Sequence, residues 1–224
     1  MRANRFKYAA FYDLDHTILM DNSATHLVNE ARKRGVMTEK NYRQAVWLSI
    51  LYKLGIGNST KMIARMITWL KGIREEVISE LCLDVFNEMI VQKIRPEILA
   101  TMEDHRSRNG AVVLLSSASK PICEPAYSHL NLDDIICSQL ESSGGILTGR
   151  TVGKLVYGKE KKTRLLAYCK AHGYDPAGAF YYGDSYTDYH VMAAVGNPVA
   201  VDPDKKLCKI ALANNWPILA RNRS

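Results

Sequence analysis

The stretch YAAFYDLDHT, residues 8–17, determines the fold and the site that we predict for this chain. Residues 8–12 form a short, mostly apolar run, which is typical of a strand buried on both faces of a parallel sheet. The run ends in Asp13 and Asp15, two carboxylates one residue apart. Because unpaired buried carboxylates destabilise a fold, this placement favours a functional role for both acids.

Further apolar runs follow along the chain, separated by helical patterns, at residues 111–115, 133–140, 178–185 and 198–202. Short apolar runs that alternate with helices indicate a parallel sheet covered by helices on both faces. The predicted fold class is therefore α/β, with a Rossmann-like sheet. The glycine-rich stretch SSGGILTGRTVG, residues 142–153, predicts a hairpin or flap.

The sequence between the first two predicted strands is helical in pattern rather than strand-like. Residues that favour helix N-caps begin three of its four predicted helices, at Asn22-Ser23, Thr38 and Ser59. We therefore predict an all-helical cap domain inserted into the α/β core. The predicted boundaries are residues 20–94 for the cap and residues 1–19 with 95–224 for the core.

Aromatic and methionine side chains recur at helical spacing in this insert, at Tyr42, Trp47, Tyr52, Met62, Met66 and Trp69. Such spacing is usual for the core of a helical bundle, which is the interpretation we favour. The alternative is an apolar pocket or a membrane-touching face for a lipid phosphate. The segments AVWLSILYKLG (45–55) and ARKR (31–34) would support that alternative.

Charge and cysteine content narrow the class of protein. The net charge of +7 over 224 residues would attract an anion such as nucleic acid, anionic lipid or a phosphorylated metabolite. No nucleic-acid-binding motif is present, so no nucleic-acid partner is predicted. The 5 cysteines form no CxxC pair, which favours reduced thiols and a cytoplasmic protein. No run reaches the ~18 apolar residues of a membrane span.

Polar side chains follow the ends of three predicted strands. Ligands bind at this edge of a parallel α/β sheet. The acids, hydroxyls and nearby lysines are Asp13, Asp15, Thr17, Ser116, Ser117, Asp184, Asp188, Lys159, Lys161 and Lys162. Because neighbouring carboxylates repel each other, a cation must offset them. Mg²⁺ binds carboxylate oxygens together with substrate phosphate, so the sequence predicts a site for Mg²⁺ and phosphate.

The ordered motifs DLDHT, LLSSAS, a downstream lysine and GDSYTD resemble the four motifs of the haloacid dehalogenase superfamily, in its magnesium-dependent phosphatase branch. The chain is most similar to the phosphoserine-phosphatase-like subgroup, whose helical cap follows the first motif. The resemblance covers nearly the whole chain. It implies an enzyme that hydrolyses a small phosphomonoester through an aspartyl-phosphate intermediate, with Mg²⁺ as cofactor.

The resemblance also implies roles for the acids. Asp13 would be the nucleophile, a known use of carboxylates. Asp15 would act as general acid and then as general base. Asp13, the backbone carbonyl of Asp15 and the carboxylate of Asp184 would hold Mg²⁺. Asp188 would orient a metal-bound water or the catalytic lysine, and Thr17 would order the turn after the nucleophile.

The remaining roles concern the phosphate. The resemblance implies that Ser116 and the amide of Ser117 hold phosphate oxygens near the start of the next helix. The hydroxyl could come from either serine, and Ser116 is preferred because it directly follows the apolar run. Lys161 would neutralise the nucleophile and the phosphoryl group, with Lys159 as the fallback.

Each motif also has a purely structural interpretation. Asp188 and Ser116 could cap helices, and Lys161 could be a solvated charge on a helix. The occurrence of all the motifs in order favours the catalytic interpretation. For His16, contact with substrate and packing beneath the cap remain equally open.

The same residues bear on alternative functions. A dehalogenase would lack the second acid, so Asp15 argues against it. The remaining alternatives are a lipid-phosphate phosphatase of the same mechanism and a non-catalytic basic protein that binds RNA or membranes. Phosphoserine phosphatases carry a glutamate shortly after the first motif that recognises the substrate amine. Here Asp21 and Asn22 lie near that place, which leaves the substrate open.

Overall fold

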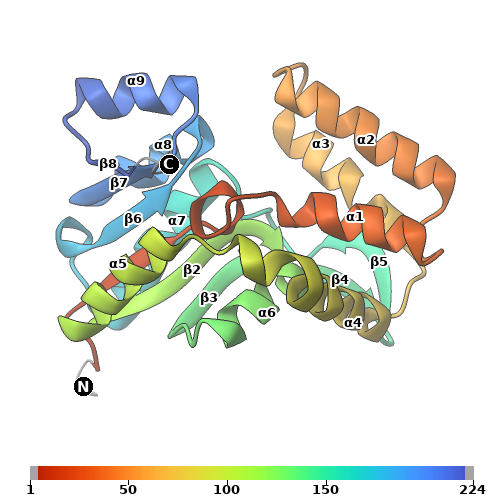
Figure 1. Ribbon diagram of the computed structural model, residues 1–224, viewed down its shortest axis with the longest axis horizontal. Coiled ribbons are helices and arrows are strands. Elements are labelled where there is room, and N and C mark those ends of the chain that lie inside the picture. The colour runs from red at the N-terminus through yellow and green to blue at the C-terminus, as the bar shows by residue number, and fades with distance from the viewer. Residues whose placement is uncertain (1–4, 220–224) are drawn as a thin grey trace.

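The computed structural model describes residues 5–219 and contains a parallel six-stranded sheet (Figure 1). The strand order is β3-β2-β1-β6-β7-β8, and every neighbouring pair is parallel. The strands are β1 Tyr8–Tyr12, β2 Gly110–Ser119, β3 Asp134–Ser138, β6 Phe180–Gly183, β7 Asn197–Val201 and β8 Ile218–Leu219. The predicted α/β fold class is confirmed. Residues 1–4 and 220–224 of the predicted core lie outside the described residues.

Helices cover both faces of this sheet. They are α5 Pro96–Ser107, α6 Lys120–His129, α7 Lys159–His172, α8 Tyr189–Met192 and α9 Lys205–Ala213. Ala10 and Tyr12 of β1 belong to a core cluster with residues of α5 and α6. Ala9 and Phe11 belong to a second cluster with residues of α7, α8 and α9. The alternation along β1 thus feeds two apolar layers, as a strand buried on both faces must.

The segment between β1 and β2 is mainly helical (Figure 1). Its helices are α1 Ser23–Lys33, α2 Glu39–Lys53, α3 Ser59–Met66 and α4 Glu75–Val85, followed by the helical turns Phe86–Ile90 and Val91–Lys93. Asn22 and Thr38 cap α1 and α2 through their side chains, as the sequence predicts. The α3 cap is Asn58 rather than Ser59, and α3 ends at Met66 before a short 3₁₀ turn.

The bundle-core prediction holds for some residues of this segment and is wrong for Trp47. Met62 and Trp69 are buried, whereas the side chain of Trp47 is 60% exposed. The reason lies in the rotation of α2: Ala45 and Leu48 take its buried face, which leaves Trp47 on the opposite side.

The predicted flap is an antiparallel hairpin of β4 Leu140–Ser143 and β5 Ile146–Thr151. It is hydrogen-bonded to the chain between α3 and α4. The Gly72 and Leu147 amides donate to the Leu147 and Ile73 carbonyls at 2.9 and 2.8 Å. Gly149 has φ +77°, and a Cβ there would lie 3.0 Å from the Thr68 carbonyl oxygen. The hairpin therefore packs directly against the helical segment.

All 5 cysteines are free thiols, which agrees with the prediction that they form no disulfides. Cys208 is partly exposed and the other four are buried. Among the described residues, no helix combines the length and the apolar character needed to cross a membrane.

Candidate active site

Three neighbouring strands, β2, β1 and β6, bring the predicted residues to one edge of the sheet. Asp13 directly follows β1, and its amide donates to the Tyr182 carbonyl of β6 at 3.0 Å. Its carboxylate Oδ1 accepts from the Leu14 amide at 2.8 Å. Asp184 directly follows β6. The strand-end placement that the sequence predicts is therefore present for both acids.

Lys161 lies at the centre of this group. It is in the first turn of α7 and is 1% exposed. Its Nζ lies 2.8 Å from Asp13 Oδ2 and 2.7 Å from Asp188 Oδ1, and it donates to the Tyr181 hydroxyl at 3.1 Å. The fallback residue, Lys159, is exposed. The interpretation of Lys161 as a solvated charge is wrong, because helix α7 inserts this side chain beneath the strand ends.

Three carboxylates form a compact acidic group. One oxygen from each of Asp13, Asp184 and Asp188 lies within 4.8 Å of the others. Thr17 is buried, and its hydroxyl donates to Asp184 Oδ1 at 3.5 Å. Carboxylate oxygens are hard ligands, so this donor set fits a cation such as Mg²⁺.

The electrostatics of the group leave it short of positive charge. Burial raises the pKa of Asp184 well above its usual value and raises that of Asp188 to about 6. Burial opposes the charged form of Lys161, but the Asp13 and Asp188 carboxylates hold its pKa well above the usual value. One ammonium thus faces three carboxylates, and a further cation would stabilise their ionised forms.

Asp15 lies apart from the acidic group. Its carboxylate accepts from the Ser23 amide at 2.8 Å and from the Asn22 side chain at 3.2 Å, at the start of α1. Burial raises the pKa of Asp15. A carboxyl group whose pKa is raised is better able to carry a proton near neutral pH, which suits a general acid.

The serines lie in the last residues of β2 rather than in the following helix. Strand β2 continues to Ser119, and α6 begins at Lys120. Ser116 is buried, with its hydroxyl accepting from the Ala118 amide at 3.3 Å. The Ser117 carbonyl accepts from the Ser138 hydroxyl of β3 at 3.0 Å. The helix-cap interpretation therefore fits Ser119 by position, but not Ser116 or Ser117.

Several contacts of the site were not predicted from the sequence. The sequence places Tyr181 within a predicted strand and gives no sign that its hydroxyl accepts from Lys161. Arg95 is buried, and it donates to the His16 carbonyl at 3.3 Å and to Asp202 at 3.1 Å. A charged residue directly before the first turn of α5 gives no local signal for such distant partners.

The loop that Arg95 holds places His16 in the left-handed region, with φ 57°. The His16 side chain is exposed. Packing beneath the cap is therefore wrong for this residue, and contact with a substrate remains open to it.

A buried tyrosine and histidine layer supports the site from below. Tyr12 and Tyr182 stack at 4.4 Å between ring centroids. His105 of α5 is buried and hydrogen-bonds the Tyr8 and Tyr182 hydroxyls, each at 2.9 Å. Because Tyr12 precedes Asp13, this layer fixes the strands that carry the acids.

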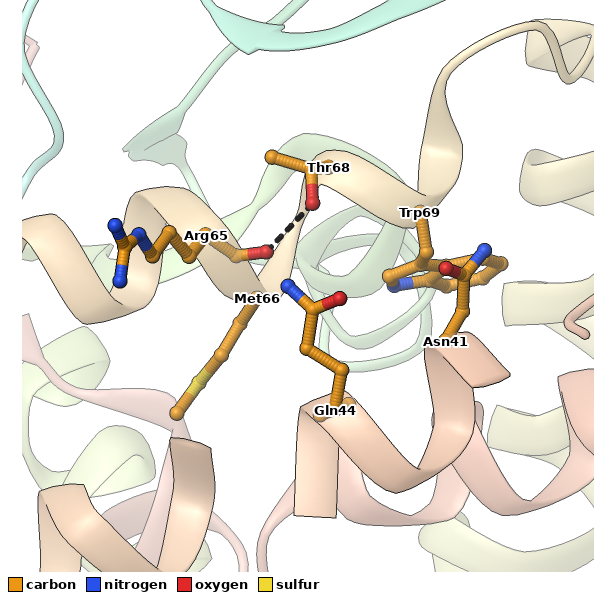
Figure 2. Close-up of a pocket in the computed structure, with 7 residues that line it drawn as sticks. Asn41, Gln44, Arg65, Met66, Thr68 and Trp69 are labelled. Atoms are coloured by element: carbon orange, nitrogen blue, oxygen red, sulfur yellow. Dashed lines mark hydrogen bonds between the residues drawn. The ribbon is translucent and has the colours of Figure 1, made fainter. Parts of the chain in front are cut away.

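A separate crevice lies between α2 and α3. Figure 2 shows Asn41, Gln44, Arg65, Met66, Thr68 and Trp69 around it, with the Thr68 hydroxyl donating to the Arg65 carbonyl at 2.8 Å. None of the predicted site residues lines this crevice. The candidate active site is therefore the strand-end group around Lys161.

The family model described as haloacid dehalogenase-like hydrolase matches residues 10–193, which include all the predicted site residues. The chain belongs to the haloacid dehalogenase-like hydrolases. The match begins inside β1 and extends beyond Asp188, so both ends of the acidic group fall within it.

Curated relatives of this hydrolase include two phosphatases. A phosphoserine phosphatase of Mycobacterium tuberculosis is 26% identical over 94% of this chain and 70% of its own length. A histidinol-phosphatase of Neisseria meningitidis is 26% identical over 95% of this chain and 98% of its own length. The predicted resemblance to the phosphoserine-phosphatase-like subgroup, which lies in the phosphatase branch of the superfamily, is confirmed.

The fold of this hydrolase also matches a solved phosphoserine phosphatase. The structure described as the phospho-aspartyl intermediate analogue of that enzyme aligns with TM-score 0.71 and 18% identity, covering 98% of this chain and 95% of that one. At this identity the likeness concerns the fold, and it supports the α/β architecture described above.

Proposed function

We propose that this hydrolase is a Mg²⁺-dependent phosphomonoester phosphatase that acts on a small phosphorylated metabolite through an aspartyl-phosphate on Asp13. The observation that carries the proposal is the buried contact of Lys161 with Asp13 and Asp188, beside Asp184 at the same sheet edge. A lysine and three carboxylates have no evident structural purpose there, because buried ion pairs are poor sources of stability.

In the proposed first step, an Asp13 carboxylate oxygen attacks phosphorus. A bond forms between that oxygen and phosphorus, and the bond from phosphorus to the substrate alcohol breaks. Asp15 gives its proton to the leaving alcohol oxygen. The raised pKa of Asp15 supports this role, since the acid must be protonated before the step.

In the proposed second step, water attacks the aspartyl-phosphate and releases inorganic phosphate. Asp15, now ionised, takes a proton from that water. The bond between Asp13 and phosphorus breaks, which restores the carboxylate. Lys161 remains paired with Asp13 throughout and offsets negative charge at the reacting group. Ser116 and the Ser117 amide would hold phosphate oxygens.

The acidic group would hold Mg²⁺ through Asp13, Asp184 and the backbone carbonyl of Asp15. When bound, Mg²⁺ would neutralise phosphate charge and act as a Lewis acid. Asp188 would position Lys161, and Thr17 would orient Asp184; both contacts are present in the structure.

We further propose that residues 20–94 act as a substrate-selecting cap over a core of residues 1–19 and 95–224. Asp21, near the place of the substrate-recognising glutamate in phosphoserine phosphatases, is already engaged. Its carboxylate lies 2.8 Å from His26 Nε2 and accepts from the Asn22 amide at 2.8 Å. This pairing favours a substrate other than phosphoserine.

The test is phosphate release from a panel of soluble phosphomonoesters, with Mg²⁺ or with a chelator. We expect activity that requires the metal and is lost in Asp13→Asn. Lys161→Met should also lose activity, and Lys159→Met, whose side chain is exposed, is its matched control. Metal-independent activity, or full activity in Asp13→Asn, would overturn the proposal. A wild type silent on soluble esters and active on lipid phosphates would favour the lipid-phosphate alternative.

A further inference from the structure

Helix α2 carries an exposed apolar face. Val46, Trp47, Ile50 and Leu54 are 40%, 60%, 45% and 66% exposed. At 3.6 residues per turn these positions lie on one side of the helix. Ile56, in the loop after α2, is 54% exposed and continues the apolar surface. Contiguous exposed apolar surface of this kind marks an interaction site more often than scattered single residues do.

The opposite side of α2 is already occupied. Ala45 and Leu48 are buried against the rest of the protein. The Tyr52 hydroxyl lies 3.3 Å from the hydroxyl of Tyr157, which lies outside the helical segment, just before α7. The apolar face is therefore not an inward face that a small rotation of α2 would bury. In Figure 1, α2 and α3 form the outer end of the helical segment, away from the sheet.

Positive charge is concentrated in the segment that contains α2 and α3. Residues 38–72 contain 6 Lys or Arg and 1 acidic residue, a net +5 of the +7 carried by the whole chain. Lys40, Lys61 and Arg65 are exposed. The one acid, Glu39, is paired with Arg32 and Arg43 at 2.7 and 3.2 Å. The apolar face thus belongs to a segment of strongly positive net charge.

We propose that the α2 face docks on an anionic lipid surface. Aliphatic and indole side chains of an amphipathic helix enter the boundary between headgroups and acyl chains, while lysines and arginines bind anionic headgroups. A second copy of this chain fits less well, because a two-fold contact through α2 would bring two segments of net charge +5 together. Nucleic acid would pair with the cations but leave the aliphatic side chains in water.

The first test uses the full chain and vesicles sedimented after mixing. Wild type should bind vesicles of phosphatidylcholine with phosphatidylglycerol and bind vesicles of phosphatidylcholine alone at least about tenfold more weakly. Salt should weaken binding. Equal binding to both vesicle types, or none to either, would overturn the proposal.

Variants separate the apolar and the charged contributions. Trp47→Ser with Leu54→Ser should lower binding about tenfold or more, since both apolar anchors are lost. The matched control is Val152→Ser with Leu212→Ser, whose side chains are 59% and 65% exposed on other elements. Equal loss in the control pair would show that general surface apolarity, and not α2, causes the binding.

A second pair tests charge. Lys40→Glu with Lys61→Glu should lower binding to anionic vesicles, while Lys170→Glu with Lys209→Glu, also exposed, should lower it less. Equal losses would overturn the assignment to α2. Analytical ultracentrifugation provides the last check: a dimer that Trp47→Ser with Leu54→Ser dissociates would identify a second copy as the occupant and contradict docking on lipid.

Discussion

The strand-end site buries charged residues, whereas the outer face of α2 exposes apolar ones, so the two regions depart in opposite ways from the usual burial of apolar residues and exposure of charged ones. The site buries Lys161 and Asp188, and α2 exposes Trp47 and Leu54. In the site, the Lys161 ammonium pairs with the Asp13 and Asp188 carboxylates at 2.8 and 2.7 Å. On α2, Trp47 and Leu54 remain 60% and 66% exposed. The difference teaches that the buried lysine of the site finds its partners within the chain, whereas the α2 face is suited to something outside it.

The largest expected effect concerns the nucleophile of the strand-end site. Asp13→Asn should lower kcat by about 10³-fold or more, because the nucleophile of a covalent mechanism is removed. Asp134→Asn is a matched control: Asp134 also accepts from the amide that follows it at 2.8 Å, but it begins β3 instead of following a strand end. Similar losses in both variants would mean that the local turn, and not the nucleophile, matters.

The next largest effect concerns the buried pairing. Lys161→Met should lower the free energy of unfolding by about 3–5 kcal/mol, because Asp13 and Asp188 lose their shared cation. Adding Asp188→Asn should recover part of that loss. Lys159→Met should cost less than about 0.5 kcal/mol, as an exposed substitution. Urea unfolding measures all three, and equal values for Lys161→Met and Lys159→Met would contradict the pairing.

Much of this arrangement could be predicted from the sequence, for a physical reason. A short apolar run followed by polar residues specifies both a buried parallel strand and its functional end, so Asp13, Ser116 and Asp184 were identifiable locally. The contacts of Tyr181 and Arg95 depend on residues distant in the chain, which local patterns do not encode. The exposure of Trp47 depends on the rotation of α2, which its mixed apolar pattern leaves ambiguous.

A smaller effect is expected from the layer beneath the site. Burial lowers the pKa of His105 from 6.5 to about 4. Between those pH values the unfolded chain binds more protons than the folded one, so His105 destabilises the fold as pH falls from 6.5 towards 4. His105 changes the free energy of unfolding by at most about 1.4 kcal/mol per pH unit.

The matched comparison is between wild type and His105→Phe across that pH range. The variant loses the hydrogen bonds of the His105 ring with Tyr8, Tyr182 and Arg108 at every pH, so its stability should be lower at pH 7. Its deficit should shrink as pH falls, because it lacks the titrating group. A deficit that stays constant between pH 7 and pH 4 would show that His105 does not bind its proton differently in the folded state.

The smallest effect tests where the two regions meet. Tyr52→Phe removes the hydroxyl contact between α2 and Tyr157, and should cost about 0.5–1 kcal/mol of stability. Vesicle binding should be unchanged, since Tyr52 lies opposite the exposed face. A loss of vesicle binding in Tyr52→Phe would show that the two sides of α2 are not independent.

The hydrogen bonds between the β4–β5 hairpin and the chain around Gly72 have a consequence for exchanging parts between related hydrolases. The hairpin lies outside residues 20–94 in sequence, yet it pairs with them through Gly72, Ile73 and Leu147. Gly149 admits no side chain at Thr68 without displacement. A chimera that transplants the helical segment alone would therefore disrupt the hydrogen bonds between this segment and the β4–β5 hairpin. The transferable module is the helical segment together with residues 140–151.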